Sequence, residues 1–185
     1  MSALHLLPVG LTDGLPLDRL RRGLEDELRV PCVVLPRRLD PASAFHAERQ
    51  QYHSTQILAG MSGFVQDGCW RILGVTTLDL YMPILTFVFG EAHLSGRCSV
   101  VSSRRLAQEF YGLPGDPELL ADRLLKESVH ELGHTVGLTH CQDYACVMAA
   151  SHSVEWIDIK GRSFCRQCGE QAASAIPARR LFGIF

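Results

Sequence analysis

The chain has 185 residues, of which 46% are hydrophobic and 21% are charged, as in ordinary globular proteins. Its formal net charge of −2 gives no reason to expect a nucleic-acid partner or an anionic membrane surface. No apolar run approaches the length of a membrane span, so we expect no membrane partner and a single domain with a buried core.

The first part of the chain has the alternation of a β-α-β unit. Apolar runs at residues 3–9 and 30–35 predict two short buried strands. Between them, residues 16–28 predict a helix, because leucines recur there at helical spacing. A strand, a helix and a strand in this order favour parallel pairing through a right-handed crossover.

The middle of the chain combines helical and strand signals. Asp40 and Pro41 are the residue types of an N-cap and a first helical position, so we predict a helix from there to about Leu58. Residues 60–68 are rich in glycine and predict a turn. Three further strands are predicted at residues 69–80, 85–89 and 97–102.

The next segment contains the pattern His-Glu-x-x-His-x-x-Gly-x-x-His, formed by His130, Glu131, His134, Gly137 and His140. His130 and His134 lie about 40° apart around a helix, so both imidazoles can bind one zinc ion. Glu131 lies about 60° from His134, where it can reach a water molecule on the metal without being a ligand. Gly137 can end the helix in a left-handed conformation, after which His140 can return as a third ligand. Three protein ligands leave a fourth position open, which is typical of catalytic zinc.

An amphipathic helix is predicted to carry this motif. Asp116 and Pro117 are the residue types of its N-cap and first position. Glu127, one turn before His130, lies on the metal side, where it either orients a ligand or is solvated. Apolar residues fall in a sector about 80° wide opposite the histidines, which indicates a core-facing side. They are Ala121, Leu125, Val129, Leu132 and Val136.

Four cysteines follow the third histidine as C-x4-C and C-x-x-C, at Cys141, Cys146, Cys165 and Cys168. The C-x-x-C pair is a common half-site for tetrahedral zinc, so the set predicts a closed structural zinc site. In an extended segment adjacent side chains point to opposite sides, so His140 would face one metal and Cys141 another. The alternatives are a pair of disulfides or free thiols in a reduced protein.

Together these patterns resemble the metzincin metallopeptidases and, within them, the archaemetzincin family. A cysteine directly after the third histidine, then C-x4-C-x-M and a later C-x-x-C, is similar to the archaemetzincin pattern. Met148 matches the Met-turn residue, which the resemblance places beneath the catalytic metal. Ala150 occupies the position where some other metzincins carry a tyrosine ligand. Similar stretches are Gly74-Val75-Thr76, Asp79-Leu80-Tyr81-Met82-Pro83, Phe87-Val88-Phe89-Gly90-Glu91, Cys146-Val147-Met148 and Asp158-Ile159-Lys160.

The resemblance implies an α/β (α+β) fold of the metzincin-like zincin type. It comprises a twisted mixed β-sheet of about five strands, three main helices, an active-site helix that ends at a glycine turn, and a small C-terminal subdomain stapled by zinc. We expect one metallopeptidase catalytic domain over residues 1–185. Residues 1–137 would form its sheet-and-helix part, and residues 138–185 its Met-turn and four-cysteine zinc part.

These residues predict a zinc-dependent metallopeptidase with two Zn²⁺ ions, one catalytic and one structural. A metal-activated water would attack the peptide bond, with Glu131 as the general base. Two alternatives stay open: a zinc-stabilised peptide-binding module with little or no turnover, and a zinc hydrolase acting on a small amide. By resemblance to metzincins, the substrate would lie along an edge strand formed by Phe87, Val88, Phe89, Gly90 and Glu91.

Residues 1–11 lack the basic start and the unbroken apolar run of a secretory signal. We therefore expect a cytoplasmic protein with reduced cysteines, which favours metal binding over disulfides. We expect a monomer whose partner is a peptide or protein substrate.

Overall fold

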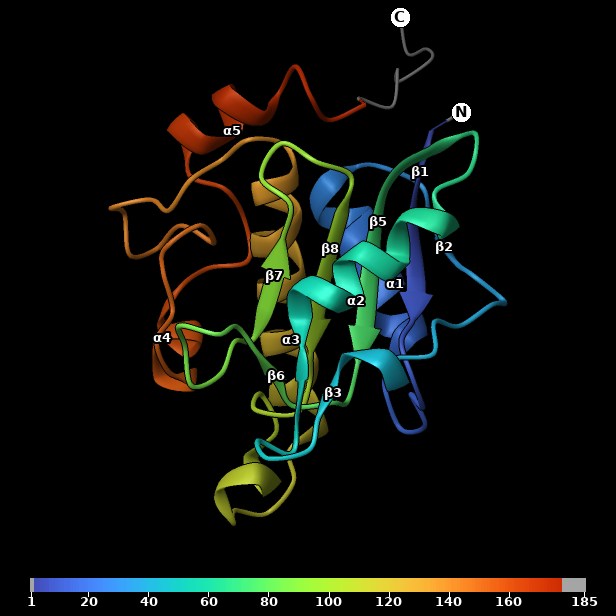
Figure 1. Ribbon diagram of the computed structural model, residues 1–185. Coiled ribbons are helices and arrows are strands. Elements are labelled where there is room, and N and C mark those ends of the chain that lie inside the picture. Colours follow the sequence, from blue (N-terminus) through green and yellow to red (C-terminus); the bar gives the residue numbers. More distant parts are fainter. Residues whose placement is uncertain (1, 178–185) are drawn as a thin grey trace, which may run out of the picture.

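A mixed five-stranded sheet forms the centre of the protein, in a computed structural model that describes residues 2–177 (Figure 1). Its strand order is β2-β1-β5-β8-β7, and only β7, at one edge, runs antiparallel to its neighbour. The mixed sheet of about five strands is therefore confirmed. The strands are β1 (Ala3–Pro8), β2 (Cys32–Val34), β5 (Cys69–Thr76), β7 (Gly90–Ala92) and β8 (Cys98–Ser102).

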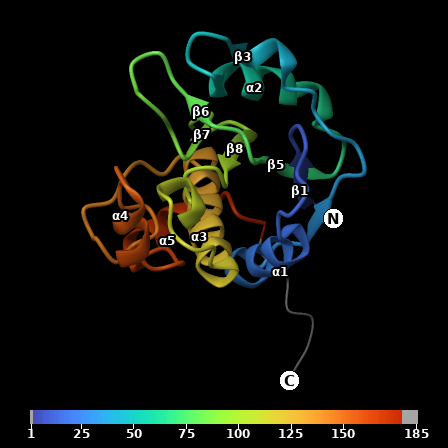
Figure 2. The ribbon, with the colours of Figure 1, turned by 90° about the horizontal axis from the view of Figure 1, so that it is seen from below.

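Helices cover both faces of this sheet (Figure 2). α1 (Leu17–Leu28) and α3 (Pro117–Thr135) pack on one face, and α2 (Ser54–Met61) packs on the other. Strand alternation divides the core between the two faces. On β1, for example, Leu4 and Leu6 join the cluster under α1 and α3, whereas Leu7 joins the cluster under α2.

The predicted β-α-β unit at the start of the chain is confirmed. β1 pairs in parallel with β2, and α1 crosses between them. The leucines at helical spacing turn inward, since Leu20, Leu24 and Leu28 are all buried. The helical period of the sequence therefore places α1 directly on the sheet.

The helix predicted from Asp40 to about Leu58 is wrong for most of its length. The Asp40 carboxylate does accept a hydrogen bond from the Ala42 amide at 3.0 Å, but this caps only a single 3-10 turn. The chain then adds two strands to a second sheet of order β3-β4-β6, and α2 begins only at Ser54. Pairing within that sheet overrides the local helical signal. The elements involved are η1 (Ala42–Ala44), β3 (Phe45–His46), β4 (Gln51–His53) and β6 (Leu80–Tyr81).

Residues 69–80 form two strands instead of the single predicted one. β5 ends at Thr76, whose Oγ1 accepts a hydrogen bond from the Leu78 amide at 3.2 Å. This side-chain bond starts a turn, and the chain resumes as β6 in the smaller sheet.

The predicted strand at residues 85–89 is a loop. The Leu85 and Thr86 carbonyls each accept a hydrogen bond from the Arg49 guanidinium at 3.0 Å, and Val88 forms a single bridge with β6, through its amide bond to the Leu80 carbonyl at 2.9 Å. The edge strand begins at Gly90 and pairs with β8. It therefore includes only the last two residues of the predicted substrate segment.

α3 is the longest helix and carries the histidine motif. Asp116 caps it as predicted, because its carboxylate accepts hydrogen bonds from the amides of Glu118 and Leu119 at 3.0 and 2.9 Å. Pro117 occupies the first helical position. Within residues 2–177, no helix is both long enough and apolar enough to cross a membrane.

Beyond α3 the chain has little regular structure. α4 (Val154–Ile159) and α5 (Arg166–Ala172) are short and lie to the side of α3, in orange and red in Figure 1. Buried residues of this region join the core under α1 and α3, among them Val147 and Ile157. Residues 178–185 of the predicted C-terminal part lie outside the described residues. The remaining short elements are η2 (Ser62–Phe64) and η3 (Gln108–Tyr111).

Candidate metal centres and active-site cleft

Three histidine rings converge at the end of α3. His130 and His134 lie on successive turns of the helix, and His140 follows the turn after it. One ring nitrogen from each lies within 4.8 Å of the others. The Nε2 atoms of His130 and His134 are 3.1 Å apart. Two nitrogen ligands of a tetrahedral zinc ion lie about 3.3 Å apart, so this spacing suits two ligands of one ion.

A glycine turn brings His140 back to the other two rings. Gly137, two residues after the helix ends, has a left-handed φ of 93°. Its amide donates a hydrogen bond to the His134 carbonyl at 3.0 Å. The Leu138 amide donates to the Gly133 carbonyl, also at 3.0 Å. These two bonds are the Schellman pair that closes a helix, so the predicted glycine turn is confirmed.

Backbone carbonyls fix how two of the rings present their nitrogens. His130 Nδ1 lies 2.8 Å from the Val147 oxygen, and His134 Nδ1 lies 2.8 Å from the Leu138 oxygen. A carbonyl can only accept, so each Nδ1 carries the proton and each Nε2 keeps a free lone pair. Burial also lowers the pKa of His130 well below its ordinary value, which favours the neutral ring. Two lone pairs that face each other at 3.1 Å fit a shared cation.

Glu131 is buried between α3 and β7, with 6% of its surface exposed. Gly90 on β7 leaves the room it needs. A Cβ at that position would lie 2.6 Å from Glu131 Cγ and 2.6 Å from the Val100 oxygen. Burial, and then the nearby Glu127 carboxylate, raise the pKa of Glu131 well above its ordinary value. The carboxyl group is therefore held at the metal site in an environment that favours a bound proton.

Met148 is completely buried against the motif helix. A Cβ at Gly133 would lie 3.1 Å from Met148 Cε, so glycine makes room for the thioether between the two histidine positions. The Cys141 amide donates a hydrogen bond to the Met148 carbonyl at 3.0 Å. The chain just after His140 is thereby tied to the methionine segment.

The four cysteines after the motif also converge, and their sulfurs lie within 4.8 Å of one another. The Sγ atoms of Cys141 and Cys165 are 3.8 Å apart. Sulfur ligands of a tetrahedral zinc ion, with bonds of about 2.3 Å, also lie about 3.8 Å apart. A disulfide needs about 2.05 Å, and all seven cysteines are free thiols, so the disulfide alternative is wrong. The cluster fits the predicted zinc-stapled subdomain.

Backbone amides surround the sulfur of Cys146. The Met148 amide donates to its Sγ at 3.4 Å, and the Cys165 amide does so at 3.2 Å. The Asp143 amide donates to Cys141 Sγ at 3.4 Å. Such donors stabilise the thiolate form that binds zinc. The sulfurs are thus presented by the backbone as metal ligands would be.

A cleft of about 560 Å³ opens beside the histidine rings. α3 contributes Glu127 and Glu131 to one wall, and β7 with the loop before it forms another. All five residues of the predicted substrate segment, 87–91, line this cleft, although only the last two belong to the edge strand. The metal-binding nitrogens, the buried carboxyl group and the edge strand therefore share one space.

The model of peptidase family M54 matches residues 21–173 of this chain. An archaemetzincin from Methanocaldococcus jannaschii is 43% identical over 137 residues, which are 74% of each chain. The chain belongs to peptidase family M54. This confirms the predicted resemblance to archaemetzincins and supports a zinc metallopeptidase.

Solved structures agree with this family. The crystal structure of archaemetzincin from Methanopyrus kandleri matches with a TM-score of 0.79 and 37% identity, over 94% of this chain and 95% of that one. A zinc-dependent peptidase from Methanocorpusculum labreanum matches with a TM-score of 0.82 and 29% identity, over 92% and 100% of the two chains. The predicted fold class is confirmed.

Sequence reasoning missed several polar residues of this candidate site. Ser151 and His152 line the cleft, and the buried Lys160 lies behind His130. None of the three has the spacing of a metal ligand, and the resemblance of Asp158-Ile159-Lys160 to archaemetzincins gives Lys160 no role. Glu127 was placed on the metal side of the helix, but the solvated alternative is wrong, because Glu127 is only 3% exposed.

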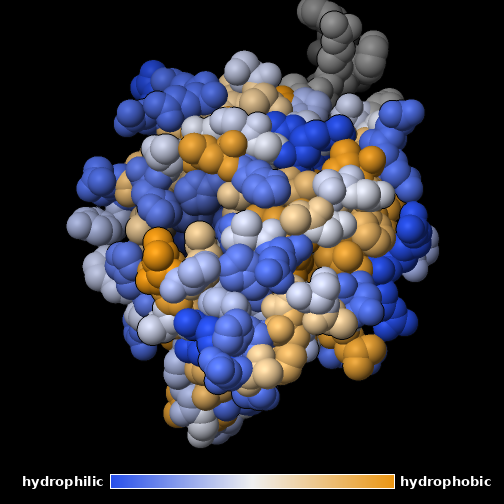
Figure 3. Space-filling model, in the orientation of Figure 1, coloured by the Kyte–Doolittle hydropathy of each residue, from blue (hydrophilic) through white to orange (hydrophobic). Residues whose placement is uncertain are grey.

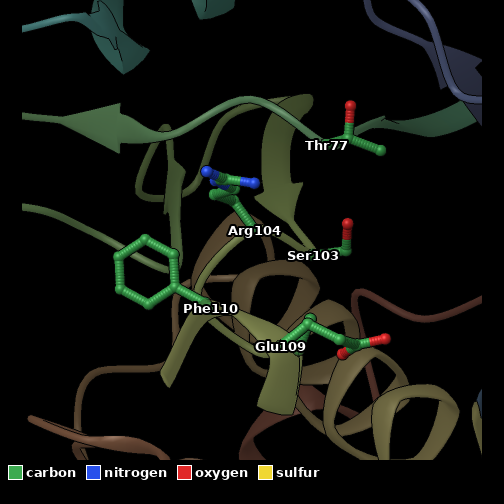
Figure 4. Close-up of a pocket in the computed structure, with 6 residues that line it drawn as sticks. Thr77, Ser103, Arg104, Glu109 and Phe110 are labelled. Carbon is green, nitrogen blue, oxygen red and sulfur yellow. The ribbon is translucent and has the colours of Figure 1, made fainter. Parts of the chain in front are cut away.

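A second, smaller hollow of about 300 Å³ lies beyond the ends of β5 and β8 (Figure 4). Thr77, Ser103, Arg104 and Phe110 line it, and no predicted site residue does. Elsewhere, the face seen in Figure 3 is mostly hydrophilic, with small separate hydrophobic groups. The cleft beside the histidines remains the candidate active site.

Proposed function

We propose that this chain is a metzincin-type zinc metallopeptidase that cleaves peptide bonds with Glu131 as the general base. One observation carries the proposal. Three histidine nitrogens and a buried carboxyl group meet in a cleft whose wall is the free edge of a sheet. Nitrogen ligands and a proton acceptor supply the chemistry of metal-assisted peptide hydrolysis, and a free strand edge supplies a way to bind an extended peptide.

His130, His134 and His140 would hold the catalytic zinc. When bound, the ion supplies a Lewis acid that polarises a peptide carbonyl and acidifies a water molecule. The histidines leave a fourth position free, and the hydrogen bonds at Nδ1 keep Nε2 of His130 and His134 aimed at the ion. Met148 supports this centre from beneath the helix, as the Met-turn of the resemblance implies.

Glu131 would accept the proton of the attacking water and pass it to the leaving amine. Its burial supports this role, because a carboxyl group in a dry site binds a proton more readily than one in water. Gly90 keeps the carboxyl group beside the edge strand, where the scissile bond would lie.

The substrate would pair with the free edge of β7. β8 occupies one edge of that strand, and the other edge faces the cleft. An extended peptide can add to such an edge through backbone hydrogen bonds. The cleft continues along residues 87–91, and this length favours a peptide over a small amide. A monomer with a peptide or protein substrate, in the cytoplasm, remains our prediction.

Cys141, Cys146, Cys165 and Cys168 would hold a second, structural zinc. Four sulfur ligands close the coordination sphere, so this ion has no position for a substrate. The binding-module alternative differs from the proposal at Glu131. A binding module needs no buried proton acceptor beside its metal, whereas Glu131 occupies that position.

Replacing Glu131 tests the proposal. Glu131→Gln should lower peptide turnover at least 100-fold, because a general base typically accelerates a reaction by roughly 10²–10⁴-fold. It should keep both zinc ions, since Glu131 is not a ligand. Glu118→Gln, at an exposed position of the same helix, is the matched control and should change neither property. Full activity of Glu131→Gln on a peptide library, or loss of its histidine-bound zinc, would show that the assignment is wrong.

A further inference from the structure

A buried ion pair beside the histidine centre has no part in the scheme above. Lys160 Nζ lies 2.7 Å from Glu127 Oε1, and the two side chains are 1% and 4% exposed. The contact is an ion pair and not a directed hydrogen bond. Lysine and glutamate are rarely buried unless they are paired, and burying such a pair costs solvation of both charges. We therefore ask what this buried ion pair does for the neighbouring histidines.

The pair touches three parts of the candidate active site. Glu127 lines the cleft from α3, one turn before His130. Lys160, just after α4, places its Nζ 3.4 Å from His130 Nδ1. The same ammonium group donates a hydrogen bond to the Ala149 carbonyl at 3.3 Å. One side chain thus links the motif helix to the residue that follows Met148.

The two charges also matter for a cation at the histidines. An ammonium group this close to His130 repels a divalent cation at the ring's other nitrogen. Glu127 supplies the opposite charge at 2.7 Å, so the pair as a whole is neutral. Glu131, on the same wall of the cleft, has no such partner among the ion pairs of residues 2–177.

We propose that Glu127 and Lys160 are positioning residues of the histidine centre. Lys160 ties the Ala149 carbonyl to Glu127 behind the His130 ring, and Glu127 cancels the charge that Lys160 brings. Glu131 then remains the carboxyl group of α3 in the cleft that has no ion-pair partner among the described residues. This inference rests on the proposed function, because it takes His130 as a zinc ligand.

Two single variants separate this role from simple support of the fold. Glu127→Gln keeps an acceptor for Lys160 but leaves its positive charge unbalanced. Zinc affinity at the histidines, measured by competition with a chelator, should fall about tenfold or more. Lys160→Gln keeps a donor but leaves the negative charge, so the affinity should stay equal or rise. The double variant, Glu127→Gln with Lys160→Gln, should lie near the wild type.

A second, half-buried pair on the same helix, whose Asp122 also contacts Arg162, provides the control. Lys126 Nζ lies 2.9 Å from Asp122 and also bonds to the Ile157 carbonyl of α4, but it does not line the cleft. Asp122→Asn should lower thermal stability and leave zinc affinity unchanged. Cobalt in place of zinc gives a second readout, since its visible spectrum should change in Glu127→Gln and not in Asp122→Asn.

The signs of these effects decide the outcome. If both single variants weaken zinc binding alike, or if Glu127→Gln leaves it unchanged, the inference is wrong. If Lys160→Gln does not fold, the other two variants decide. The inference then requires that Glu127→Gln binds zinc weakly and that the double variant binds zinc about as well as the wild type. Failure of either expectation contradicts the inference. A wild-type protein that binds no zinc at the histidines would instead contradict the proposed function.

Discussion

The histidine centre and the cysteine centre are built on different kinds of backbone. Two of the three histidines are on α3, whose turns place them before any metal binds. Of the four cysteines, Cys141 and Cys146 lie in an irregular segment, and only Cys168 lies inside a helix, the short α5. A helix fixes its own side chains, whereas irregular segments need an added crosslink. On the proposed function, a helix therefore preforms most of the open histidine centre, whereas zinc at the closed cysteine centre would hold loops in place.

Residues 146–149 join the two centres. Cys146 belongs to the sulfur cluster, and the next carbonyl, that of Val147, lies 2.8 Å from His130 Nδ1. Met148 packs under α3, and the Ala149 carbonyl accepts a hydrogen bond from Lys160. A change at the closed centre should therefore reach the open one.

Breaking the closed centre should have the largest effect. Cys146→Ser removes a ligand that lies in this shared segment, because a hydroxyl group is a poor zinc ligand. The cysteine-bound zinc should be lost, and the melting temperature should fall, since metal binding contributes to folding free energy. The affinity of the histidines for zinc should also fall, about 10–100-fold, because His140 loses its anchor. Metal analysis, calorimetry and chelator competition measure the three effects.

Cys98→Ser is the control for that variant. Cys98 is also a buried free thiol, but it lies in β8 and belongs to neither cluster. It should keep both zinc ions. If Cys146→Ser loses its cysteine-bound zinc but keeps full zinc affinity at the histidines, the two centres are independent.

A change at the open centre should affect turnover without loss of metal. In Gly90→Ala the new methyl group would lie 2.6 Å from Glu131 Cγ and from the Val100 oxygen. Such overpacking costs about 1–3 kcal/mol and displaces either the carboxyl group or β7. We expect at least a tenfold loss of kcat/KM with both zinc ions retained. Gly63→Ala, which meets no atom within 4 Å, should behave as the wild type in the same assay.

The buried carboxyl group should also affect stability in the metal-free protein. The pKa of Glu131 is raised in the folded state, so folding opposes its ionisation at neutral pH. Glu131→Gln should therefore raise the free energy of unfolding at pH 7. The gain should shrink as pH falls through the raised pKa and vanish below the ordinary value of 4.5. Denaturant unfolding in chelator at several pH values measures this, and a gain that is independent of pH would contradict it.

The smallest effect is expected at the start of the motif helix. Asp116→Ala removes the hydrogen bonds to the Glu118 and Leu119 amides, which should cost about 1 kcal/mol of stability. Both metal centres should be unchanged, because they lie at and beyond the other end of α3. Chelator competition checks this, and a loss of zinc affinity would mean that the helix is less preformed than we infer.

Local signals explain which parts could be predicted from the sequence. The cap at Asp116, the turn at Gly137 and the spacing of His130 and His134 all depend on residues a few positions apart. The strands at residues 45–53 depend on pairing with β6, almost thirty residues later. The loop at residues 85–89 depends on Arg49. Such long-range contacts leave no periodic trace in the sequence.

Within the candidate site, Lys160 is also placed by contacts between distant segments, which the sequence does not reveal. Lys160 lies in a stretch that resembles archaemetzincins, but neither that resemblance nor the spacing of residues in α4 shows that the end of this short helix packs behind His130. Only the docking of this segment on α3 brings Lys160 to Glu127. The convergence of the two candidate ligand sets could be predicted because metal ligands keep fixed spacings, whereas the groups that support them come from any part of the fold.

Metal content before and after mild chelation tests the comparison most directly. The account predicts two zinc ions per chain in freshly purified protein, of which the histidine-bound ion leaves first and takes peptidase activity with it. The cysteine-bound ion should remain, and the protein should keep its melting transition and regain activity when zinc is returned. One zinc ion or none in the fresh protein, or the loss of both ions together, would contradict the division into an open catalytic centre and a closed structural one.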